Sequence, residues 1–312
     1  MNIIKNKNIF FALSGVLVAL SIISVAVFGL SFGIDFTGGT LVEVGYDLPR
    51  DAAGKAGGTR PSFEALSSVL ADAGFEEVSL RETGENGYVL RTATLSTEQR
   101  ENLPAIFSYQ GGTAHVERLT EIGPTIGTEL RNKAYLAIAL VFVCILFFIA
   151  FVFRKVSEPV SSWIYGAIAL VTLCFDVLIP TGFFAFLGSV TGASVDTLFV
   201  TAILTILGYS VHDTIVVFDR TRENLRINQE KSRKENFEDT AGRALSQTIT
   251  RSVNTSVTTL AALAALYLLG PDSIKDFSLT LLVGIIAGTY SSIFFATPLL
   301  VAYEQWQKNR KK

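Results

Sequence analysis

The sequence predicts a polytopic α-helical membrane protein with six transmembrane helices and one α+β extracytoplasmic domain between the first and second of them. Three observations lead to this prediction. Of the 312 residues, 49% are hydrophobic and only 17% are charged, whereas soluble domains carry about 25% charged residues. Six predominantly apolar windows are long enough to cross a bilayer. One long segment between two of these windows instead combines turn residues with alternating polar patterns.

The six windows are the predicted transmembrane helices, because about 20 mostly apolar residues cross the ~30 Å hydrocarbon layer. The first window follows Lys5 and Lys7 and therefore resembles a signal peptide. Its 22 residues exceed the about 7–15 of a signal h-region, and no small-x-small cleavage site follows. We interpret it as a retained anchor. The windows cover residues 9–30, 134–153, 163–188, 197–218, 252–269 and 277–302.

Basic residues in the short connections predict the orientation, since Lys and Arg collect on the cytoplasmic side. The short loops 189–196 and 270–276 contain one basic residue between them, Lys275. We therefore predict a multi-pass protein of the cytoplasmic (inner) membrane with both termini in the cytoplasm. The predicted divisions are residues 1–30 (N-terminus and first helix), 31–133 (periplasmic domain), 134–302 (five helices with a cytoplasmic loop at 219–250) and 303–312 (basic tail). The basic positions are Lys5, Lys7, Arg154, Lys155, the stretch 220–251, Lys308, Arg310, Lys311 and Lys312.

The pattern of polar and apolar residues in 31–133 predicts a folded domain with the element order βαββαβ. Pro61 before Ser62, and Ser96 with Thr97 ahead of Glu98, are typical helix starts. This order fits a ferredoxin-like sandwich. The predicted strands are 40–46, 76–82, 87–93 and 114–120, and the predicted helices are 62–73 and 97–109.

Several classes of function lack support in the sequence. The net charge of −2 gives no global positive field for nucleic acid. A phosphate-binding loop and a zinc motif such as H-E-x-x-H are both missing. The segment from Gly208 to His212 begins like a nucleophile elbow but lacks its final glycine and lies in a predicted spanning helix. We therefore expect no enzymatic activity, no cofactor and no metal site.

Asp213 is the clearest functional candidate, because it is an ionisable residue at membrane depth. A charge there costs about 2.5–3.5 kcal/mol on insertion scales. Asp213 lies six residues before Asp219, or roughly 9 Å inside the predicted end of the fourth window. Ser210 and Tyr209 share its helical face and are expected to hydrogen-bond it, whereas His212 points about 100° away. The alternative is an inert buried acid held by its neighbours.

Two further ionisable residues join this prediction. Arg251 stands at the start of the fifth window, and its stem is long enough to bring the guanidinium to the depth of Asp213. Asp176 lies in the third window, four residues before Pro180. Hydrocarbon favours the neutral form of a carboxyl group and a nearby arginine favours the ionised form, so such a pair suits a proton-linked switch. The alternatives are that Arg251 only reaches the headgroups and that Asp176 only satisfies backbone opened by the proline.

Two motifs carry a family resemblance. The residues GIDFTGGT at 33–40 and GYSVHDTIVVFDRTREN at 208–224 resemble the signatures of the SecD/SecF family of protein-export membrane proteins, and the resemblance extends over essentially the whole chain. That family is similar to the RND transporters, in which acidic residues of the fourth helix carry protons. The resemblance implies that Asp213 is the proton carrier and Arg251 its basic partner. It also marks Asp35, Gly38, Gly39 and Gly208 as motif positions.

The resemblance also implies a function. It implies an accessory subunit that works with SecD and uses the proton motive force to promote late steps of protein export across the cytoplasmic membrane. The implied partners are SecD, the SecYEG translocon, YajC, unfolded preprotein and protons. Two alternatives stay open: an RND-like exporter of lipids or small molecules, and a passive scaffold of the translocon.

Two glycine pairs have separate interpretations. Gly38 and Gly39 allow a sharp turn from the membrane into the first strand, and a hinge that transmits motion to the outer domain is the alternative. Gly284 and Gly288 are four residues apart on one helical face and are expected to let another helix approach closely.

Overall fold

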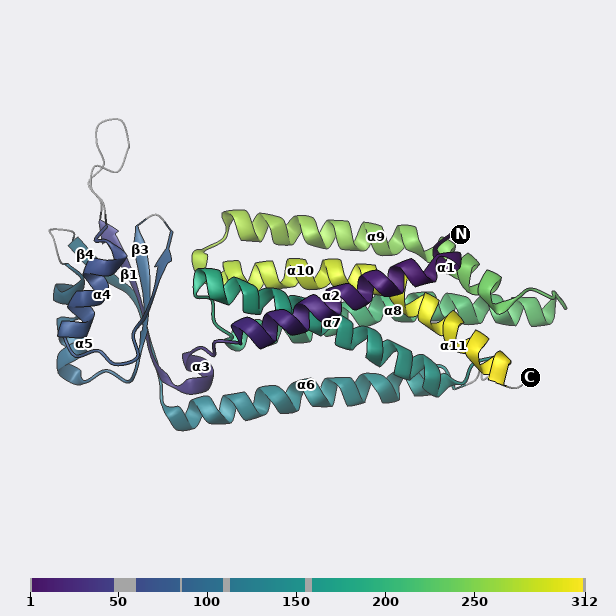
Figure 1. Ribbon diagram of the computed structural model, residues 1–312, viewed down its shortest axis with the longest axis horizontal. Coiled ribbons are helices and arrows are strands. Elements are labelled where there is room, and N and C mark those ends of the chain that lie inside the picture. Colours follow the sequence, from purple (N-terminus) through teal and green to yellow (C-terminus); the bar gives the residue numbers. More distant parts are fainter. Residues whose placement is uncertain (1, 48–59, 85, 109–112, 155–158, 311–312) are drawn as a thin grey trace, which may run out of the picture. The chain divides into compact units, whose positions relative to one another are not determined.

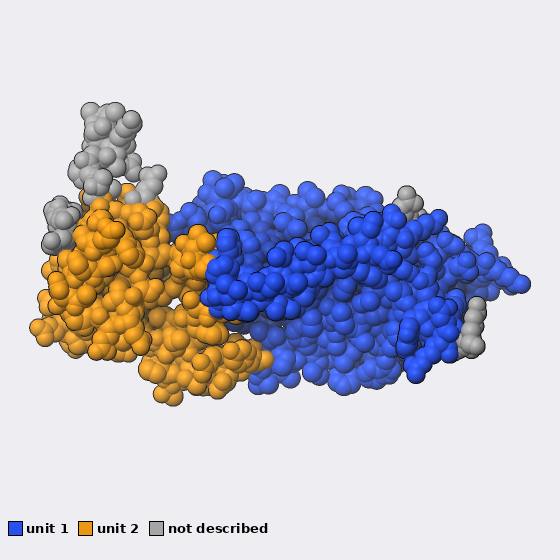
Figure 2. All heavy atoms as spheres, in the orientation of Figure 1, with its two compact units in different colours: residues 1–29, 136–186, 198–312 blue, residues 30–135, 187–197 orange. Residues whose placement is uncertain are grey.

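The computed structural model describes residues 2–47, 60–84, 86–108, 113–154 and 159–310 (Figure 1). The chain forms two compact units (Figure 2). Unit 1 comprises Met1–Gly29, Leu136–Phe186 and Leu198–Lys312, and unit 2 comprises Leu30–Tyr135 and Leu187–Thr197. The predicted helix end at Tyr109 and the predicted basic positions Lys155, Lys311 and Lys312 lie outside the described residues.

The prediction of six apolar helices is confirmed: the described residues contain six helical spans long and apolar enough to cross a membrane. Most of their length belongs to unit 1, where the helices form a bundle (Figure 1). The last span is interrupted by a π-helical turn, η3 (Ser292–Ala296). The spans are α2 (Lys7–Phe28), α6 (Pro124–Val152), α7 (Ser162–Thr191), α8 (Thr197–Glu230), α9 (Phe237–Leu269), and a last span made of η2 (Asp272–Ile274), α10 (Lys275–Ser291), η3 and α11 (Thr297–Arg310); a short α1 (Asn2–Lys5) precedes them.

The spans differ in how much of their surface is inside the bundle. Buried residues make up 44% of the apolar windows of α7 and α8 and 56% of that of the last span, but only 11% in α2, α6 and α9. α7, α8 and α10 therefore form the interior of unit 1, where polar side chains are screened from lipid. Asp176 and Asp213 lie on two of these helices.

Three helices extend well beyond their predicted windows. α8 has 34 residues and is therefore about 51 Å long, which exceeds the ~30 Å hydrocarbon thickness. It continues to Glu230, and α9 begins at Phe237, so most of the predicted cytoplasmic loop consists of the continuations of these two helices. α6 starts at Pro124 instead of residue 134. The predicted windows stop at charged residues because these are costly in lipid, but a helix can continue through charged residues.

Unit 2 contains a four-stranded antiparallel sheet with the strand order β2-β3-β1-β4. The chain enters it through a short helix, α3 (Ile34–Thr37), that follows the first span. The central strand β1 pairs with β3 on one side and β4 on the other. In chain order the elements are β1 (Gly39–Asp47), α4 (Phe63–Asp72), β2 (Ser79–Thr83), β3 (Gly87–Thr92), α5 (Thr97–Phe107) and β4 (Thr113–Ile122).

The two helices of unit 2 pack on one face of this sheet. Their starts follow from local chemistry, since Ser62 caps α4 and Ser96 forms a capping box with Gln99 at the start of α5. Alternate residues of β1 point into the core, as the two-residue period of a strand requires. The core contains Val42, Val44, Tyr46, Leu66, Leu70, Tyr88, Leu90, Leu103 and Phe107.

Candidate functional site

Asp213 lies on the buried face of α8 and is only 5% exposed. Ser252 of α9 lies beside its carboxyl group, and His212 and Arg251 are near enough to act on its charge. The buried Oδ2 atom of Asp213 has no hydrogen-bond partner within the described part of the chain. This oxygen can therefore exchange a proton without first breaking a hydrogen bond. An unpaired buried oxygen is costly for an ionised carboxylate.

The structure places Arg251 near Asp213 but does not pair the two side chains. Arg251 is exposed, whereas its neighbour Ser252 is fully buried. Both Arg251 and Asp213 belong to the described residues, and no ion pair joins them. The positive charge of Arg251 is near enough to interact with the carboxyl group without a direct ion pair.

Asp176, on α7, is fully buried and contacts α8. Ser210 donates a hydrogen bond from Oγ to Oδ2 of Asp176, and Ser291 at the end of α10 lies beside the same carboxyl group. Its Oδ1 atom has no hydrogen-bond partner within the described ranges. The side chain therefore contacts neighbouring helices and does not satisfy backbone opened by Pro180. Three helices meet at this carboxyl group.

The expected hydrogen bonds from Ser210 and Tyr209 to Asp213 are not formed, so this prediction is wrong. Ser210 donates to Asp176, and Tyr209 donates from its hydroxyl to Ser256 Oγ at 3.3 Å. Both residues instead hydrogen-bond to acceptors on neighbouring helices, Asp176 on α7 and Ser256 on α9. The residue spacing within one helix cannot predict such partners, because they lie on other helices of the chain.

The glycines of α10 bring that helix against α8, as predicted. A Cβ atom on Gly284 would lie 2.1 Å from Ile206 Cδ1, and one on Gly288 would lie 3.0 Å from Ser210 Cβ. The two contacts are four residues apart on both helices, so this is a continuous close approach. It holds Ser210 in place beside Asp176. The π-helical turn η3 follows directly, and such turns are frequent at functional sites.

Hydrogen bonds between hydroxyl groups connect α8, α9 and α10. Ser256 of α9 shares a hydrogen bond of 2.6 Å with Thr289 of α10, and Tyr209 donates to the same serine. Ser252 and Ser256 are buried, whereas Asn254, Thr255 and Thr258 on the same helix are exposed. The polar run of α9 thus has one face inside the bundle and one face outside it. The hydroxyls of α10 and η3 were not predicted, although Ser291-Ser292 is unusual in an apolar span.

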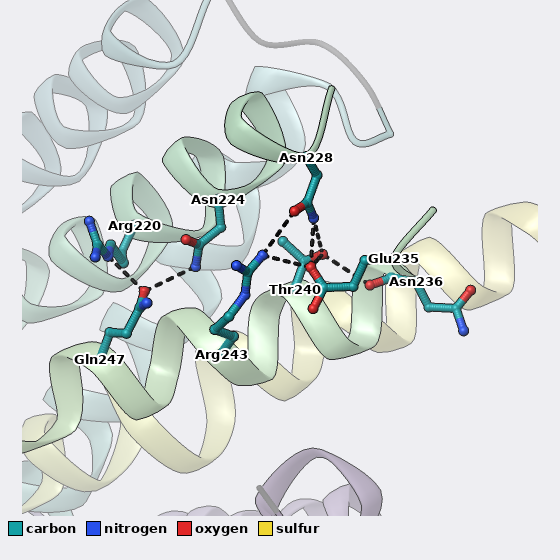
Figure 3. Close-up of polar contacts among 8 residues, drawn as sticks. All are labelled: Arg220, Asn224, Asn228, Glu235, Asn236, Thr240, Arg243 and Gln247. Atoms are coloured by element: carbon teal, nitrogen blue, oxygen red, sulfur yellow. Dashed lines mark hydrogen bonds and ion pairs between the residues drawn. The ribbon is translucent and has the colours of Figure 1, made fainter. Parts of the chain in front are cut away.

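Where α8 and α9 extend past their apolar parts, a polar cluster joins them (Figure 3). Arg243 of α9 donates to Glu235 Oε2 at 2.6 Å and to Asn228 Oδ1 of α8 at 3.1 Å. Gln247 accepts from Arg220 Nε at 2.7 Å and from Asn224 Nδ2 at 3.1 Å. Sequence reasoning missed this cluster, since its members come from both sides of a turn.

Glu235 is the electrostatic centre of this cluster. Burial acts in the opposite direction, but hydrogen bonds from Asn228 and Thr240, together with the charge of Arg243, hold the pKa of Glu235 below its ordinary value. The ionised carboxylate therefore persists at neutral pH and keeps its donors. This fixes the start of α9 against the end of α8, and so the relative placement of Ser252 and Asp213.

The glycines of the first motif are packed tightly within unit 2. Gly38 has φ +81°, and a Cβ atom there would lie 2.7 Å from Pro124 Cα. Gly39 has φ +120°, and a Cβ atom there would lie 2.6 Å from Thr92 O. Side chains at either position would be both strained and too close to backbone. The predicted sharp turn is therefore present, and it is fixed by close neighbours.

The other two motif positions have different surroundings. Asp35 accepts two hydrogen bonds from Thr197, the first residue of α8, through its Oδ2 atom. Gly208 is exposed, and a Cβ atom on it would meet no atom within 4 Å. No contact inside the described chain accounts for a glycine at this position.

Comparisons with known proteins agree with these observations. A family described as the SecD/SecF GG motif matches residues 23–47, and one described as "Protein export membrane protein SecD/SecF, C-terminal" matches residues 104–306. The protein translocase subunit SecF of Thermobaculum terrenum is 41% identical and covers 97% of this chain and 94% of its own length. The same subunit of Anaerolinea thermophila is 35% identical and covers 98% of this chain and 96% of its own.

A solved structure is also similar over nearly the whole chain. SecDF from Thermus thermophilus, described as a translocon-associated membrane protein, matches with a TM-score of 0.81 and 32% identity. The match covers 98% of this chain but only 39% of the SecDF chain, so this chain corresponds to less than half of that protein. The motifs, the six apolar spans and these similarities together show that the chain is a multi-pass membrane protein that belongs to the SecD/SecF family of protein-export membrane proteins.

Proposed function

We propose that this chain is a SecF-type subunit that, with a SecD-type partner, uses the proton motive force to promote late steps of protein export across the cytoplasmic membrane. The observation that supports this most strongly is the pair of buried carboxyl groups in unit 1. Asp213 and Asp176 each keep one buried oxygen without a partner among the described residues. They lie on neighbouring helices that are connected through Ser210.

The energetics suit a proton-driven conformational change. An ionised carboxylate at membrane depth costs about 2.5–3.5 kcal/mol, and a proton moving down the potential yields about 2.3 kcal/mol per 100 mV. The two quantities are similar in size. Protonation of Asp213 would release the attraction to Arg251, and deprotonation would restore it. The chain would thus act by changing conformation and would need neither a cofactor nor covalent catalysis.

An exposed polar stripe on unit 1 supports a membrane partner. Exposed residues of α8 recur at helical spacing on one face, and exposed polar residues of α9 do the same. Such a surface is unfavourable against lipid and suits contact with other helices. This chain covers 39% of the SecDF chain, and we propose that a SecD-type protein corresponds to the remainder. The stripe comprises Thr201, Thr205, Gly208 and His212 of α8 and Arg251, Asn254, Thr255 and Thr258 of α9.

The proposed topology follows from the basic residues. Both termini and the polar cluster around Glu235 lie in the cytoplasm, and residues 31–133 form a periplasmic domain. Its βαββαβ order and its strand order β2-β3-β1-β4 support a ferredoxin-like fold. This domain would meet unfolded preprotein, and the assembly would include the SecYEG translocon and YajC.

The proposal is tested by the proton-driven stimulation, which is the ratio of preprotein export rates with and without a proton motive force in vesicles that contain the assembled complex. Asp213→Asn is expected to reduce this ratio to one while the subunit still assembles. A passive scaffold would keep the ratio unchanged. An exporter of lipids or small molecules would show proton-driven efflux of such compounds in vesicles that contain no translocon.

Asp176 is expected to contribute to the same process. Asp176→Asn keeps an oxygen that accepts from Ser210 but cannot bind and release a proton. We predict that it lowers the proton-driven stimulation about tenfold without lowering the thermal stability of the chain. Ser210→Ala, which breaks the hydrogen bond and leaves the acid, is expected to have a smaller effect. Normal proton-driven stimulation in Asp176→Asn would indicate that Asp176 has only a structural role.

Gly208 tests the proposed partner surface. The glycine is exposed in this chain, so Gly208→Phe is expected to leave the chain itself folded. Against a closely packed partner helix, the added ring would cause overpacking that costs about 1–3 kcal/mol of binding free energy. We expect this cost to lower co-purification of the SecD-type partner about tenfold. Ile286→Phe, at an exposed apolar position of α10, is the control and is expected to have no effect. Equal co-purification of both variants would place the partner elsewhere.

A further inference from the structure

A hydrogen-bonded contact joins two segments that lie 162 residues apart, the first motif and the start of α8. Asp35 Oδ2 accepts from the backbone N–H of Thr197 at 2.8 Å and from its Oγ1 hydroxyl at 2.5 Å. Thr197 is the first residue of α8. The first N–H groups of a helix have no partner within it, and the helix dipole favours a negative charge there. The Asp35 carboxylate thus supplies both a hydrogen-bond acceptor and a matching charge.

Backbone contacts next to Asp35 support the same attachment. Gly33 donates to Val195 O at 2.8 Å, and Val195 donates to Ser31 O at 2.7 Å. Phe32 and Val195 form a parallel bridge. A Cβ atom on Gly33 would lie 2.9 Å from Ser194 Oγ. Residues 31–33 and Asp35 therefore contact residues 194–197, which lead into α8 and begin it.

The other end of the motif is attached to the sheet and to α6. Gly38 and Gly39 have positive φ angles and pack against backbone of Pro124 and Thr92. A Cβ atom on Gly127, in the first turn of α6, would lie 2.8 Å from Gly38 N. β1 begins directly at Gly39. The motif is thus a short, closely packed connection, within unit 2, between the first residue of α8 and the central strand.

We propose that Asp35 is a positioning residue that fastens the first turn of α8 to the segment leading into β1, so that a movement of α8 reaches the sheet. This inference rests on the proposed proton-driven function. Asp213 lies 16 residues along the same helix from Thr197, or about 24 Å. A helix transmits a displacement over that length because its backbone hydrogen bonds keep it rigid. Without Asp35, α8 would still respond to protonation, but the response would reach β1 less completely.

The test separates proton exchange from its transmission. Assembled complexes carry Asp35→Ala, Thr197→Val, or both, and Asp72→Ala at an exposed acid of α4 is the control. Three quantities are measured: co-purification of the SecD-type partner, proton exchange at Asp213 by infrared difference spectroscopy, and the proton-driven stimulation. We expect Asp35→Ala to lower the stimulation about fivefold while assembly and proton exchange stay unchanged. A purely structural role would lower all three quantities together.

The pair of substitutions identifies the contact itself. Thr197→Val removes the hydroxyl donor, keeps the backbone N–H, and is expected to lower the stimulation less than Asp35→Ala does. In the Asp35→Ala background it should add little, because the two changes remove one shared interaction. If the Asp35→Ala complex fails to assemble, the Thr197→Val complex alone tests the proposal. Normal proton-driven stimulation in Thr197→Val would then overturn it.

The outcomes for the two proposals are distinguishable. Normal stimulation in Asp213→Asn contradicts the proposed function as a whole. Lost stimulation in Asp213→Asn together with normal stimulation in Asp35→Ala contradicts only the positioning role of Asp35. Full additivity of Asp35→Ala and Thr197→Val also contradicts it.

Discussion

Asp213→Asn is expected to abolish the proton-driven stimulation of export and to leave assembly with the SecD-type partner intact. Asparagine has nearly the same volume and keeps an oxygen next to Ser252, so the packing of α8 and α9 should survive. It cannot bind and release a proton, so the conformational change loses its source of free energy. The chain itself should be at least as stable as the parent, because a buried ionisable group has been removed.

Asp219→Asn is the matched control for this experiment. Asp219 is an exposed acid six residues further along the same helix, with a side chain that is 63% exposed. Its substitution is expected to leave the stimulation within the error of the parent. Stimulation that survives in Asp213→Asn, or that is lost equally in Asp219→Asn, would contradict a specific role for the buried carboxyl group.

Gly182→Ala is expected to produce the largest loss of stability. A Cβ atom there would lie 2.4 Å from Ser21 Cα and 2.9 Å from Ser21 O. These are backbone atoms of α2, so α2 and α7 would have to move apart, and the hydrogen bond from Ser24 Oγ to Gly182 O would be disturbed. Overpacking of this kind costs about 1–3 kcal/mol. The free energy of unfolding of the purified chain in detergent micelles measures it.

Gly208→Ala is the control, because Gly208 is also within a spanning helix but has open space around it. It is expected to be neutral or stabilising by up to about 1 kcal/mol, since alanine favours helix over glycine. Ser21→Gly should not rescue Gly182→Ala, because the clashing Cα and carbonyl remain. Rescue by that substitution, or equal effects at both glycines, would show that the two helices do not touch through backbone.

Much of the membrane architecture follows from the sequence alone, and the reasons are physical. Backbone groups in hydrocarbon must be satisfied within the helix, so a sufficiently long apolar window implies a span. All six spans were predicted for this reason. Their ends were not, because α8 continues through charged residues to Glu230 and α6 begins ten residues before its window. Outside the bilayer, charge no longer limits a helix, and partners such as Gln247 and Arg243 stabilise the continuation.

The sequence predicts Asp213 and Asp176 as candidates because a carboxyl group at membrane depth is expensive, and this cost is visible in one sequence. The structure buries both side chains, and their role stays a prediction. Their partners were not found, since Ser210 turns to Asp176 and Ser252 approaches Asp213 from another helix. Helix periodicity gives the face on which a side chain lies, but not which neighbouring helix covers that face. Partners on other helices depend on tertiary packing and require the structure.

The first motif, residues 33–40, also shows that local requirements can be predicted from sequence whereas distant partners cannot. The need for glycine at Gly38 and Gly39 is local, because a turn requires their backbone angles. The role of Asp35 is not local, since its partner Thr197 lies far along the chain.

The most direct test of the central claim is infrared difference spectroscopy of the assembled complex during export, with the Asp213→Asn complex as the reference. We predict a carboxyl band, absent from the reference, that appears and disappears as the proton motive force is applied and removed. A band from Asp213 that stays constant throughout turnover, while export is still stimulated, would contradict the account.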